Sequence, residues 1–211
     1  MNIVRLRFSA FGLTVLLGLA FLMVGFYVEF GQIRRFDAAG SAFVARFECP
    51  VMTAVMKGLT FIGSPAMTLL LTVAASLFLY FAAGHRRETI FFITVVAGAL
   101  LLNPFMKNLF HRERPNTNRL IEVTGLSFPS GHSMAAFALY GTLCYLLWRN
   151  VSHAAGRTLL IASGLFMTAG IGISRIYLGV HYPSDVLGGY LATAAWLCLS
   201  ICMFNKRLSR P

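Results

Sequence analysis

The sequence predicts an all-α, polytopic membrane protein with six transmembrane helices, on the basis of its composition and the lengths of its apolar runs. Of its 211 residues, 57% are hydrophobic and only 12% are charged, with a mean hydropathy of +0.72. Soluble domains carry about twice that charged fraction. A spanning helix needs ~20 mostly apolar residues. Six runs approach that length: Phe8–Val28, Pro65–Ala83, Thr89–Met106, Gly131–Trp148, Thr158–Ser174 and Val186–Phe204.

The first apolar run, Phe8–Val28, is expected to be an uncleaved span, although Arg5 and Arg7 precede it as they would in a signal peptide. It is longer than the ~7–15 residues of a signal-peptide core, and no small-x-small cleavage site follows at once. The apolar runs continue along the chain without a Ser/Pro/Gly-rich linker. We therefore expect a single domain over residues 1–211.

The segment after the first span, residues 36–62, has helical periodicity on both sides of Pro50. The pattern predicts two short amphipathic helices that lie in the outer membrane interface. Two interpretations stay open: a packing element with no function of its own, or a rim that guides lipid headgroups toward a site. The apolar positions are Phe36, Phe43, Val44 and Phe47, then Val51, Met52, Val55, Met56 and Leu59.

The formal net charge of +11 does not by itself indicate nucleic-acid binding, because the basic residues form short clusters between apolar runs. Placing both termini in the cytoplasm divides the 18 Lys and Arg residues equally between the two faces. The inner ones lie beside helix ends in very short loops, where the positive-inside rule is strongest. Several outer ones belong to the candidate site below. We therefore expect cytoplasmic termini and an outward-facing site.

Several further polar, charged or small residues are expected to have structural roles only. We expect Arg112 to be an interfacial anchor, and Asn103 and Pro104 to mark a bend near the outer end of the third span. His111 and His153 are expected at the surface, and the cysteines are not expected to form a disulfide. Glycines in the last two spans are expected at close helix contacts: Gly164, Gly170, Gly172, Gly188 and Gly189.

Polar residues gather in three clusters at the borders of apolar runs, over residues 107–115, 129–132 and 174–185. With six spans, all three clusters emerge on the same face of the membrane. The topology therefore permits them to form one site.

Each cluster contains groups suited to binding phosphate. Lys107 supplies a point charge and Arg114 a planar fork. Ser130 and Gly131 lead directly into a predicted helix, whose free N–H groups and dipole favour an anion. Arg175 lies at the edge of a span, where an ionisable residue is costly and usually functional. Three cations and a helix N-terminus fit a group with two negative charges.

The remaining polar residues can supply reactivity. His181 and Asp185 are four residues apart, with Pro183 as a plausible first helical residue between them. A carboxylate there can accept one imidazole N–H, fix the tautomer and present the other nitrogen as a nucleophile. His132, from another helix, can protonate a leaving oxygen. Three converging cations would repel Mg²⁺ or Zn²⁺, so we expect no metal and no other cofactor.

The ordered pattern Lys-x6-Arg-Pro, Pro-Ser-Gly-His and Ser-Arg-x5-His-x3-Asp resembles the signature of the type 2 phosphatidic acid phosphatase superfamily, which includes vanadium haloperoxidases. The motifs cover residues 107–185, and the six-span layout resembles the membrane branch. The resemblance implies that His181 forms a phosphohistidine, that Asp185 supports it and that His132 is the general acid. It also implies that phosphate is bound by Lys107, Arg114, Ser130, Gly131 and Arg175.

The resemblance implies a metal-independent lipid phosphatase of the bacterial cell membrane. Undecaprenyl pyrophosphate is the favoured substrate, with phosphatidylglycerophosphate and phosphatidate as alternatives, because the motifs read the phosphate and not the lipid tail. An anionic-lipid transporter is the alternative from another class, although binding alone requires neither two histidines nor a carboxylate. A haloperoxidase-like enzyme fits a lipid-embedded site poorly. The expected partners are a lipid phosphate and membrane lipids, without nucleic acid or an obligate protein partner.

Overall fold

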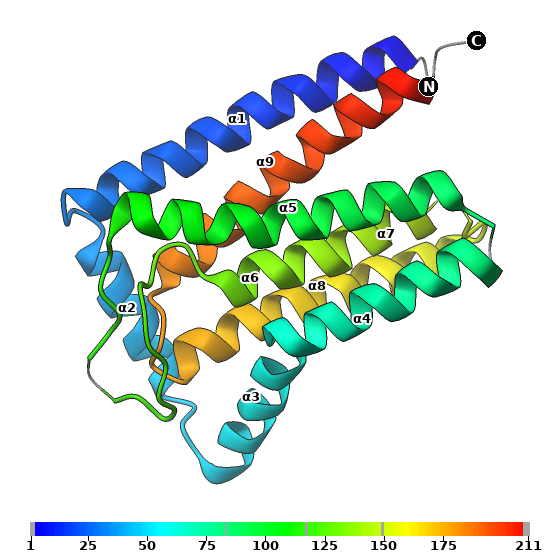
Figure 1. Ribbon diagram of the computed structural model, residues 1–211. Coiled ribbons are helices and arrows are strands. Elements are labelled where there is room, and N and C mark those ends of the chain that lie inside the picture. Colours follow the sequence, from blue (N-terminus) through cyan, green and yellow to red (C-terminus); the bar gives the residue numbers. More distant parts are fainter. Residues whose placement is uncertain (1–2, 83, 117, 149, 209–211) are drawn as a thin grey trace.

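The computed structural model describes residues 3–82, 84–116, 118–148 and 150–208, and every regular element in these ranges is a helix (Figure 1). This confirms the all-α prediction. The elements are α1 (Ile3–Glu29), α2 (Arg34–Ala45), α3 (Pro50–Ile62), α4 (Pro65–Leu77), the π-helical η1 (Phe78–Ala82), α5 (Arg86–Phe110), α6 (Gly131–Ala136), the π-helical η2 (Phe137–Gly141), α7 (Thr142–Leu147), α8 (Ala154–Tyr177) and α9 (Pro183–Leu208).

Within the described ranges, four helices are long and apolar enough to cross a membrane: α1 over Ala10–Glu29, α5, α8, and α9 over Pro183–Phe204. A fifth candidate is α3 together with α4, a pair that is bent by 55° at its break. The stretch from Gly131 to Leu147 is also helical, but it is divided among α6, η2 and α7. The six predicted apolar runs are thus helical over nearly all of their described residues, and four or five of the resulting elements qualify as candidate spans.

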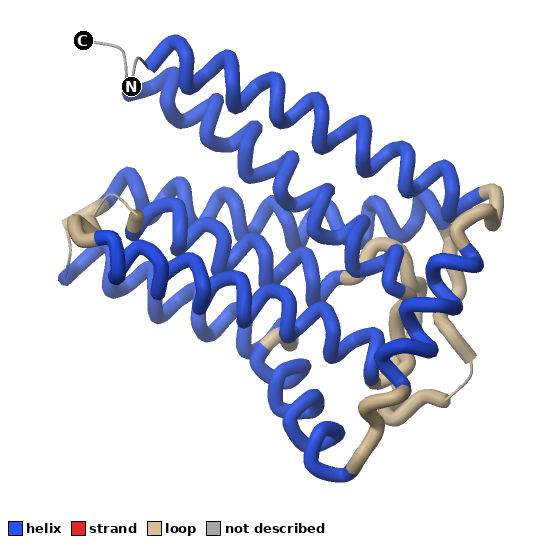
Figure 2. Tube along the Cα trace, turned by 180° about the vertical axis from the view of Figure 1, so that it is seen from behind, coloured by secondary structure: helices blue, strands red, loops and turns tan. Residues whose placement is uncertain are grey.

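Both chain ends lie at one end of the bundle, and the loops that carry the predicted polar clusters lie at the other end, beside α2 (Figure 1, Figure 2). The paired α1 and α9 run side by side, while α4, α5, α7 and α8 form the rest of the bundle. An even number of crossings would place the termini together in this way. The arrangement brings the three polar clusters to a common end.

Among the described residues, two of the three apolar clusters fill the bundle. The larger is centred on α5 and includes Phe92, Val95 and Leu139, which are at most 1% exposed. The second joins Phe21 of α1 to Phe128 and Met134 beside the polar clusters. Burial of such side chains contributes roughly 1.5–3 kcal/mol each, so the loop that contains Phe128 is held firmly against the bundle.

The outer surface of the bundle is strongly apolar, as expected for helices surrounded by lipid. Large side chains of α1, α5 and α8 are more than half exposed, among them Leu16 at 63%, Leu101 at 74% and Phe166 at 67%. Backbone groups in a bilayer must be satisfied internally, which a helix achieves by itself. The exposed apolar surface and the helical fold therefore agree on a multi-pass membrane protein.

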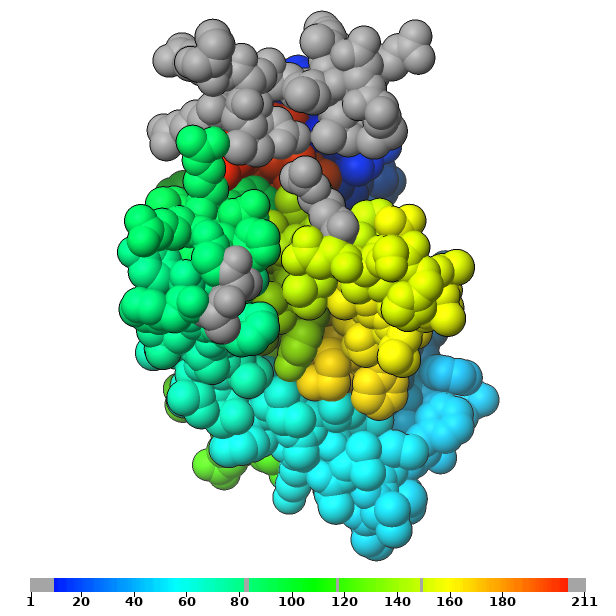
Figure 3. Space-filling model, turned by 90° about the vertical axis from the view of Figure 1, so that its right-hand side faces the viewer, coloured from blue at the N-terminus to red at the C-terminus, as the bar shows by residue number. Residues whose placement is uncertain are grey.

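The two short helices predicted after the first span are present as α2 and α3. Seen from the end that carries the termini, α3 projects below the bundle (Figure 3). Phe36, Phe43 and Phe47 are each more than half exposed, whereas Asp37 is the one residue of α2 that is buried, at 2% exposure. The polar contacts of α2 therefore point inward and its aromatic side chains outward.

Candidate active site

The three predicted polar clusters meet at one end of the bundle, as the topology required. The Ser130 N–H donates to the Asp185 carbonyl over 3.0 Å, which joins the second cluster to the third. The Ser127 N–H donates to the Arg112 carbonyl over 2.8 Å, which joins the loop before α6 to the first cluster. The His181 N–H donates to the carbonyl of Arg175 over 3.2 Å. Backbone hydrogen bonds thus fix the relative positions of all three.

His181 and Asp185 form the predicted pair. His181 Nδ1 lies 3.3 Å from Asp185 Oδ2, and both side chains are almost completely buried. Asp185 is the third residue of α9, which begins at Pro183 as predicted. Its Oδ2 also accepts the backbone N–H of Tyr182 over 2.8 Å, a contact of the capping-box type. The start of α9 therefore orients the carboxylate that orients the histidine.

The neighbours of His181 determine its tautomer. Arg114 Nη1 lies 3.0 Å from His181 Nε2, and a guanidinium can only donate hydrogen bonds. Nε2 must therefore be the unprotonated nitrogen, and Nδ1 carries the hydrogen that faces the carboxylate of Asp185. Arg114 is itself held by the carbonyls of Gly125 and Val180, each at 2.9 Å. The lone pair of Nε2 thus faces the cationic side of the site.

Burial keeps His181 neutral at physiological pH. Removal from water lowers the pKa of His181 to about 4, the Asp185 contacts oppose that shift, and the charges of Arg114 and Arg175 add to it. Burial also lowers the pKa of Arg114 from its ordinary value, though an arginine remains charged at neutral pH. A neutral imidazole beside cations is suited to attack an anionic phosphorus centre.

Two further cations face the same space. Arg175, at the end of α8, is 2% exposed, and its Nη1 donates to Thr60 Oγ1 of α3 over 2.6 Å. Its Nε is buried and has no hydrogen-bond partner, so this donor is available to an anion. Lys107, in the last turn of α5, lies within electrostatic range of Arg114 and Arg175. Like charges that are held together in this way need an anion between them.

The start of α6 supplies the remaining predicted groups. Ser130 is fully buried and caps α6, its Oγ accepting the Ser133 N–H over 3.4 Å. His132, the second residue of α6, is partly buried and has no hydrogen bond with any described residue; it lies within electrostatic range of Arg175 and His181. Its ring nitrogens are therefore not engaged by any described residue.

The prediction that Asn103 only marks a bend is wrong. Its Nδ2 donates to the Pro129 carbonyl over 3.0 Å and approaches Met134 Sδ at 3.2 Å. A Cβ added to Gly131 would lie 2.9 Å from Asn103 Oδ1, so glycine permits this close approach. Asn103 thus holds the loop that leads into α6 against α5.

The prediction that Arg112 is an interfacial anchor is also wrong. Its guanidinium is 14% exposed and bridges two carboxylates, with Nη1 2.7 Å from Asp185 Oδ1 and Nη2 2.6 Å from Asp37 Oδ2. Ser127 Oγ donates to Asp185 Oδ2 over 2.5 Å, and Ser184 Oγ donates to Asp37 Oδ2 over 2.8 Å. Sequence reasoning missed Asp37, Ser127 and Ser184. The one usable signal was an acidic residue, Asp37, at the start of a segment that is mostly apolar.

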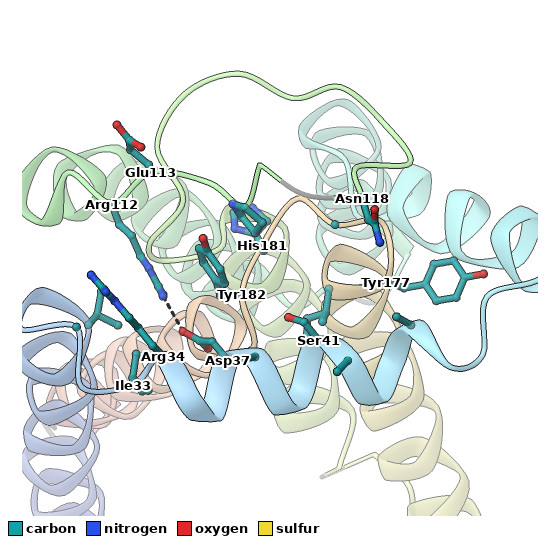
Figure 4. Close-up of a pocket in the computed structure, with 18 of the residues that line it drawn as sticks. Ile33, Arg34, Asp37, Ser41, Arg112, Glu113, Asn118, Tyr177, His181 and Tyr182 are labelled. Atoms are coloured by element: carbon teal, nitrogen blue, oxygen red, sulfur yellow. Dashed lines mark hydrogen bonds and ion pairs between the residues drawn. The ribbon is translucent and has the colours of Figure 1, made fainter.

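A cleft of about 630 Å³ lies beside His181, between α2, the end of α1 and the loops that follow α5 and α8 (Figure 4). Asp37 and Ser41 of α2 point into it from one side, and Arg112 and Tyr182 face it from the other. Of the predicted site residues only His181 lines this cleft. The cations predicted to bind phosphate therefore do not line this cleft.

The remaining structural expectations can be compared directly. His111 and His153 are exposed, as predicted. The glycines lie at close helix contacts, also as predicted: added Cβ atoms at Gly164, Gly172 and Gly188 would collide with Cys144, Tyr190 and Phe128. Among the described residues, no three His, Cys, Asp or Glu side chains are arranged to hold a metal ion.

Comparisons with known proteins agree with this geometry. The model of the PAP2 superfamily matches residues 65–209. Phosphatidylglycerophosphatase B of Bacillus subtilis (strain 168) is 31% identical over 200 residues, covering 93% of this chain and 96% of that protein. A protein of Escherichia coli (strain K12), provisionally named an undecaprenyl-diphosphatase, is 31% identical over 137 residues, 63% of this chain and 65% of that one.

The fold has also been seen in a solved structure. The crystal structure of a transmembrane PAP2-type phosphatidylglycerolphosphate phosphatase from Bacillus subtilis superposes with a TM-score of 0.80 at 29% identity. The match covers 93% of this chain and 98% of that one. The helical arrangement described above is therefore shared over nearly the whole length of both proteins.

Proposed function

This chain belongs to the PAP2 superfamily, and from that premise we propose that it is a membrane lipid phosphatase in which His181 is the nucleophile. The observation that carries this proposal is the arrangement of the His181 ring, with Nδ1 facing Asp185 and the unprotonated Nε2 facing Arg114. A histidine held in this tautomer is prepared for attack. The family relation supports the reaction class, and the ring geometry supports the assignment of the nucleophile.

In the first step, His181 Nε2 attacks the phosphorus in line with the bond to the leaving oxygen. That bond breaks as the new N–P bond forms, and the leaving oxygen takes a proton from His132. The imidazole then carries a positive charge, which Asp185 stabilises through Nδ1–H. The products of this step are the dephosphorylated lipid and a phosphohistidine.

In the second step, water attacks the phosphohistidine while neutral His132 accepts one of its protons. The N–P bond breaks, inorganic phosphate leaves and His181 returns to its neutral form. Both steps require charge neutralisation of the phosphoryl oxygens more than covalent chemistry. Lys107, Arg114 and Arg175 are assigned to that role, together with the N–H groups that follow Ser130 and Gly131 at the start of α6.

The reaction is proposed to need no metal ion. Cations from α5, α8 and the loop that follows α5 face the position where a metalloenzyme would place carboxylates. The arrangement therefore supplies positive charge through side chains. Full phosphate release after dialysis against EDTA, with inhibition by vanadate as a phosphate mimic, is the expected result. Activity that is lost in EDTA and restored by Mg²⁺ would contradict this.

Phosphatidylglycerophosphate is the substrate we rank first, ahead of undecaprenyl pyrophosphate, which the sequence alone favoured. The relative named phosphatidylglycerophosphatase B aligns over 96% of its own length. The relative named as an undecaprenyl-diphosphatase aligns over 65% of its own length. Phosphatidate stays as a third candidate. The motifs are assigned to the phosphate group and not to the lipid tail, so the choice of substrate depends on surfaces outside them.

The experiment that tests the function is phosphate release by the purified protein from these three lipids in detergent micelles, with His181→Ala as the inactive control. Release by the wild type and none by the variant is expected. A protein that binds these lipids without releasing phosphate would instead support the anionic-lipid transporter.

The site is proposed to face the outside of the cell, with six crossings, cytoplasmic termini, and α2 and α3 in the outer interface. Cys49, between α2 and α3, is exposed. Its backbone N lies 3.3 Å from the Oη of Tyr177, a residue that lines the cleft. A variant that keeps only this cysteine should react with a membrane-impermeant maleimide in intact cells, and Cys49→Ser in the same background should not. Labelling that requires lysed cells would reverse the orientation.

A further inference from the structure

Two carboxylates, those of Asp185 and Asp37, lie on the Nδ1 side of His181 and are connected through Arg112. Asp185 contacts His181 directly, while Asp37 belongs to α2, far away in the sequence, and is as deeply buried as a core residue. Buried carboxylates are costly unless they are paired and hydrogen-bonded. The contacts of Asp37 therefore need a specific explanation.

Asp37 accepts three hydrogen bonds, all from groups at the start of α9 or from Arg112. Its Oδ1 accepts the Ser184 N–H over 2.9 Å, and its Oδ2 accepts the Ser184 hydroxyl over 2.8 Å. The first of these satisfies a free N–H in the first turn of α9, where a carboxylate also opposes the positive end of the helix dipole. Asp37 thus caps, from another helix, the same helix start that orients Asp185.

Arg112 connects the two carboxylates. Its Nη2 contacts Asp37, its Nη1 contacts Asp185, and the guanidinium lies over the ring of Tyr182 at 4.1 Å from the centroid. Figure 4 shows Arg112 reaching toward Asp37 across the edge of the cleft. A planar fork held at both nitrogens and on one face has little freedom to turn. The contact with Asp37 therefore helps to fix the Arg112 guanidinium against Asp185.

We propose that Asp37 is a positioning residue for the phosphatase reaction, acting through Arg112 to hold Asp185 and to balance the charge behind His181. This inference rests on the proposed function, because its readout is turnover. Asp37 does not touch the reacting atoms. Its negative charge compensates Arg112, so that Asp185 can support a positively charged imidazole without a full uncompensated cation behind it.

Because Asp37 and Arg112 carry opposite charges, removing each one should shift the acid limb of the pH profile in opposite directions. Loss of the Asp37 charge leaves Arg112 balanced by Asp185 alone, so the surroundings of His181 become less negative. This disfavours protonated His181 and moves the acid limb of kcat/KM to lower pH. Loss of the Arg112 charge leaves two carboxylates, which favours protonated His181 and moves the limb to higher pH. Each shift should be on the order of half a pH unit, because the removed charge lies beyond direct contact with the ring.

The other charged groups near His181 stay the same in every variant, so they do not decide the sign. They come from each element packed around the ring: Arg114 of the loop after α5, Arg175 of α8, His132 of α6 and Asp185 of α9, with Lys107 of α5 facing His132.

The experiment measures the pH profile of p-nitrophenyl phosphate hydrolysis for the full chain in detergent. This ester has a leaving group that departs without a proton, so the acid limb reports the nucleophile rather than His132. Its own ionisation is common to all variants, and only differences between variants are interpreted. The variants are Asp37→Asn, Arg112→Gln, their double combination and Glu113→Gln.

Asp37→Asn should lower kcat on the order of tenfold, the scale of second-layer partners of functional histidines, with a smaller change in KM. The double variant removes equal and opposite charges, so its acid limb should return to within about 0.2 pH units of wild type. Glu113→Gln is the matched control, because Glu113 is exposed, adjacent to Arg112, and in no hydrogen bond with a described residue. Its profile should equal that of the wild type.

The inference is overturned if both single variants move the limb in the same direction, or if Asp37→Asn behaves like Glu113→Gln. Thermal melting in detergent identifies variants that do not fold. The double variant keeps the net charge of this cluster, and Arg112→Lys keeps the cation while losing the fork, so these two variants still test the inference if a single variant unfolds. Arg112→Lys should lower kcat without moving the acid limb. A wild-type protein that releases no phosphate would refute the proposed function instead.

Discussion

The two ends of the helical bundle carry similar residue types but hold them in different ways. At the end with the termini, Arg86 lies over Tyr80 at 5.3 Å and Arg157 over Trp148 at 4.9 Å, and the His85–Glu88 pair, at 3.9 Å, is 40% and 42% exposed. At the other end, Asp185 is fully buried and makes contacts of 2.5 to 3.3 Å with its partners. The two ends therefore differ in how far their charged side chains are removed from water, and not only in which charges they carry.

This difference teaches how a site and an anchor can be told apart. Basic side chains over aromatic rings keep their charge near water and anchor a helix end at an interface. Cations that are buried beside one another, without enough anions, are held at a cost in stability. Such a cost is expected where a negatively charged ligand binds, and each prediction below tests whether the two ends really differ in this way.

The largest expected difference between the ends concerns their histidines. His132→Ala should lower kcat on a lipid monophosphate by ~10²–10⁴-fold, the usual range for loss of a general acid. The loss should be much smaller on p-nitrophenyl phosphate, which needs no proton on its leaving group. His153→Ala, an exposed histidine at the other end, is the matched control and should retain wild-type activity on both substrates. Equal losses on the two substrates would remove His132 from the role of proton donor.

The pH dependence sharpens the comparison, because it reports burial directly. Burial lowers the pKa of His181 to about 4, and the neutral form is the reactive one. The kcat/KM profile should therefore stay high below pH ~6.5, the ordinary histidine value, and fall only as the pH decreases toward that lowered pKa. Steady-state rates with p-nitrophenyl phosphate measure this. An acid limb at pH ~6.5 would mean that the ring is as solvated as an exposed histidine.

A smaller effect is expected where α3 supports a cation of the site. Thr60→Val keeps the shape of the side chain but removes the acceptor for Arg175 Nη1. The loss of one hydrogen bond worth about 0.5–1.5 kcal/mol should raise KM roughly 3- to 10-fold with less change in kcat. Thr94→Val, on the exposed face of α5, removes a hydroxyl that bonds only to its own helix and should have no effect. Equal effects of the two variants would show that α3 does not position Arg175.

The smallest effect is expected at the end with the termini. Arg157→Gln removes a cation over Trp148 and a 2.8 Å hydrogen bond from Nε to the Val151 carbonyl. Turnover should stay within about twofold of wild type, while the melting temperature in detergent decreases slightly, since such contacts contribute about 0.5–1 kcal/mol. A large loss of turnover with an unchanged melting temperature would show that this end also takes part in catalysis.

The sequence predicted those parts of the molecule that depend on local pattern. The lengths of the apolar runs predicted the helices of the bundle, and Pro183 predicted the start of α9. The motif spacing predicted the pairing of His181 with Asp185. Each of these features is determined by residues that are close together in the chain or by a repeated motif order.

The parts that sequence reasoning missed depend on contacts between distant segments. Arg112 has the composition of an anchor, and only the tertiary fold brings it between Asp37 and Asp185. Asn103 likewise looks like a helix irregularity in the sequence, and only the fold shows its hydrogen bond to the Pro129 carbonyl. Single-sequence patterns report which residues are polar, but not which polar residues face each other across the fold.

The central claim, that His181 carries the phosphoryl group, is tested most directly by trapping it. The protein is incubated briefly with a substrate labelled in its phosphate, quenched in alkaline denaturant and assayed for acid-labile phosphate on the chain. A phosphohistidine at position 181 is expected in the wild type and none in His181→Ala. With p-nitrophenyl phosphate as donor, His132→Ala should retain the label. Label that persists in His181→Ala but is lost in His132→Ala would contradict the central claim and exchange the roles of the two histidines.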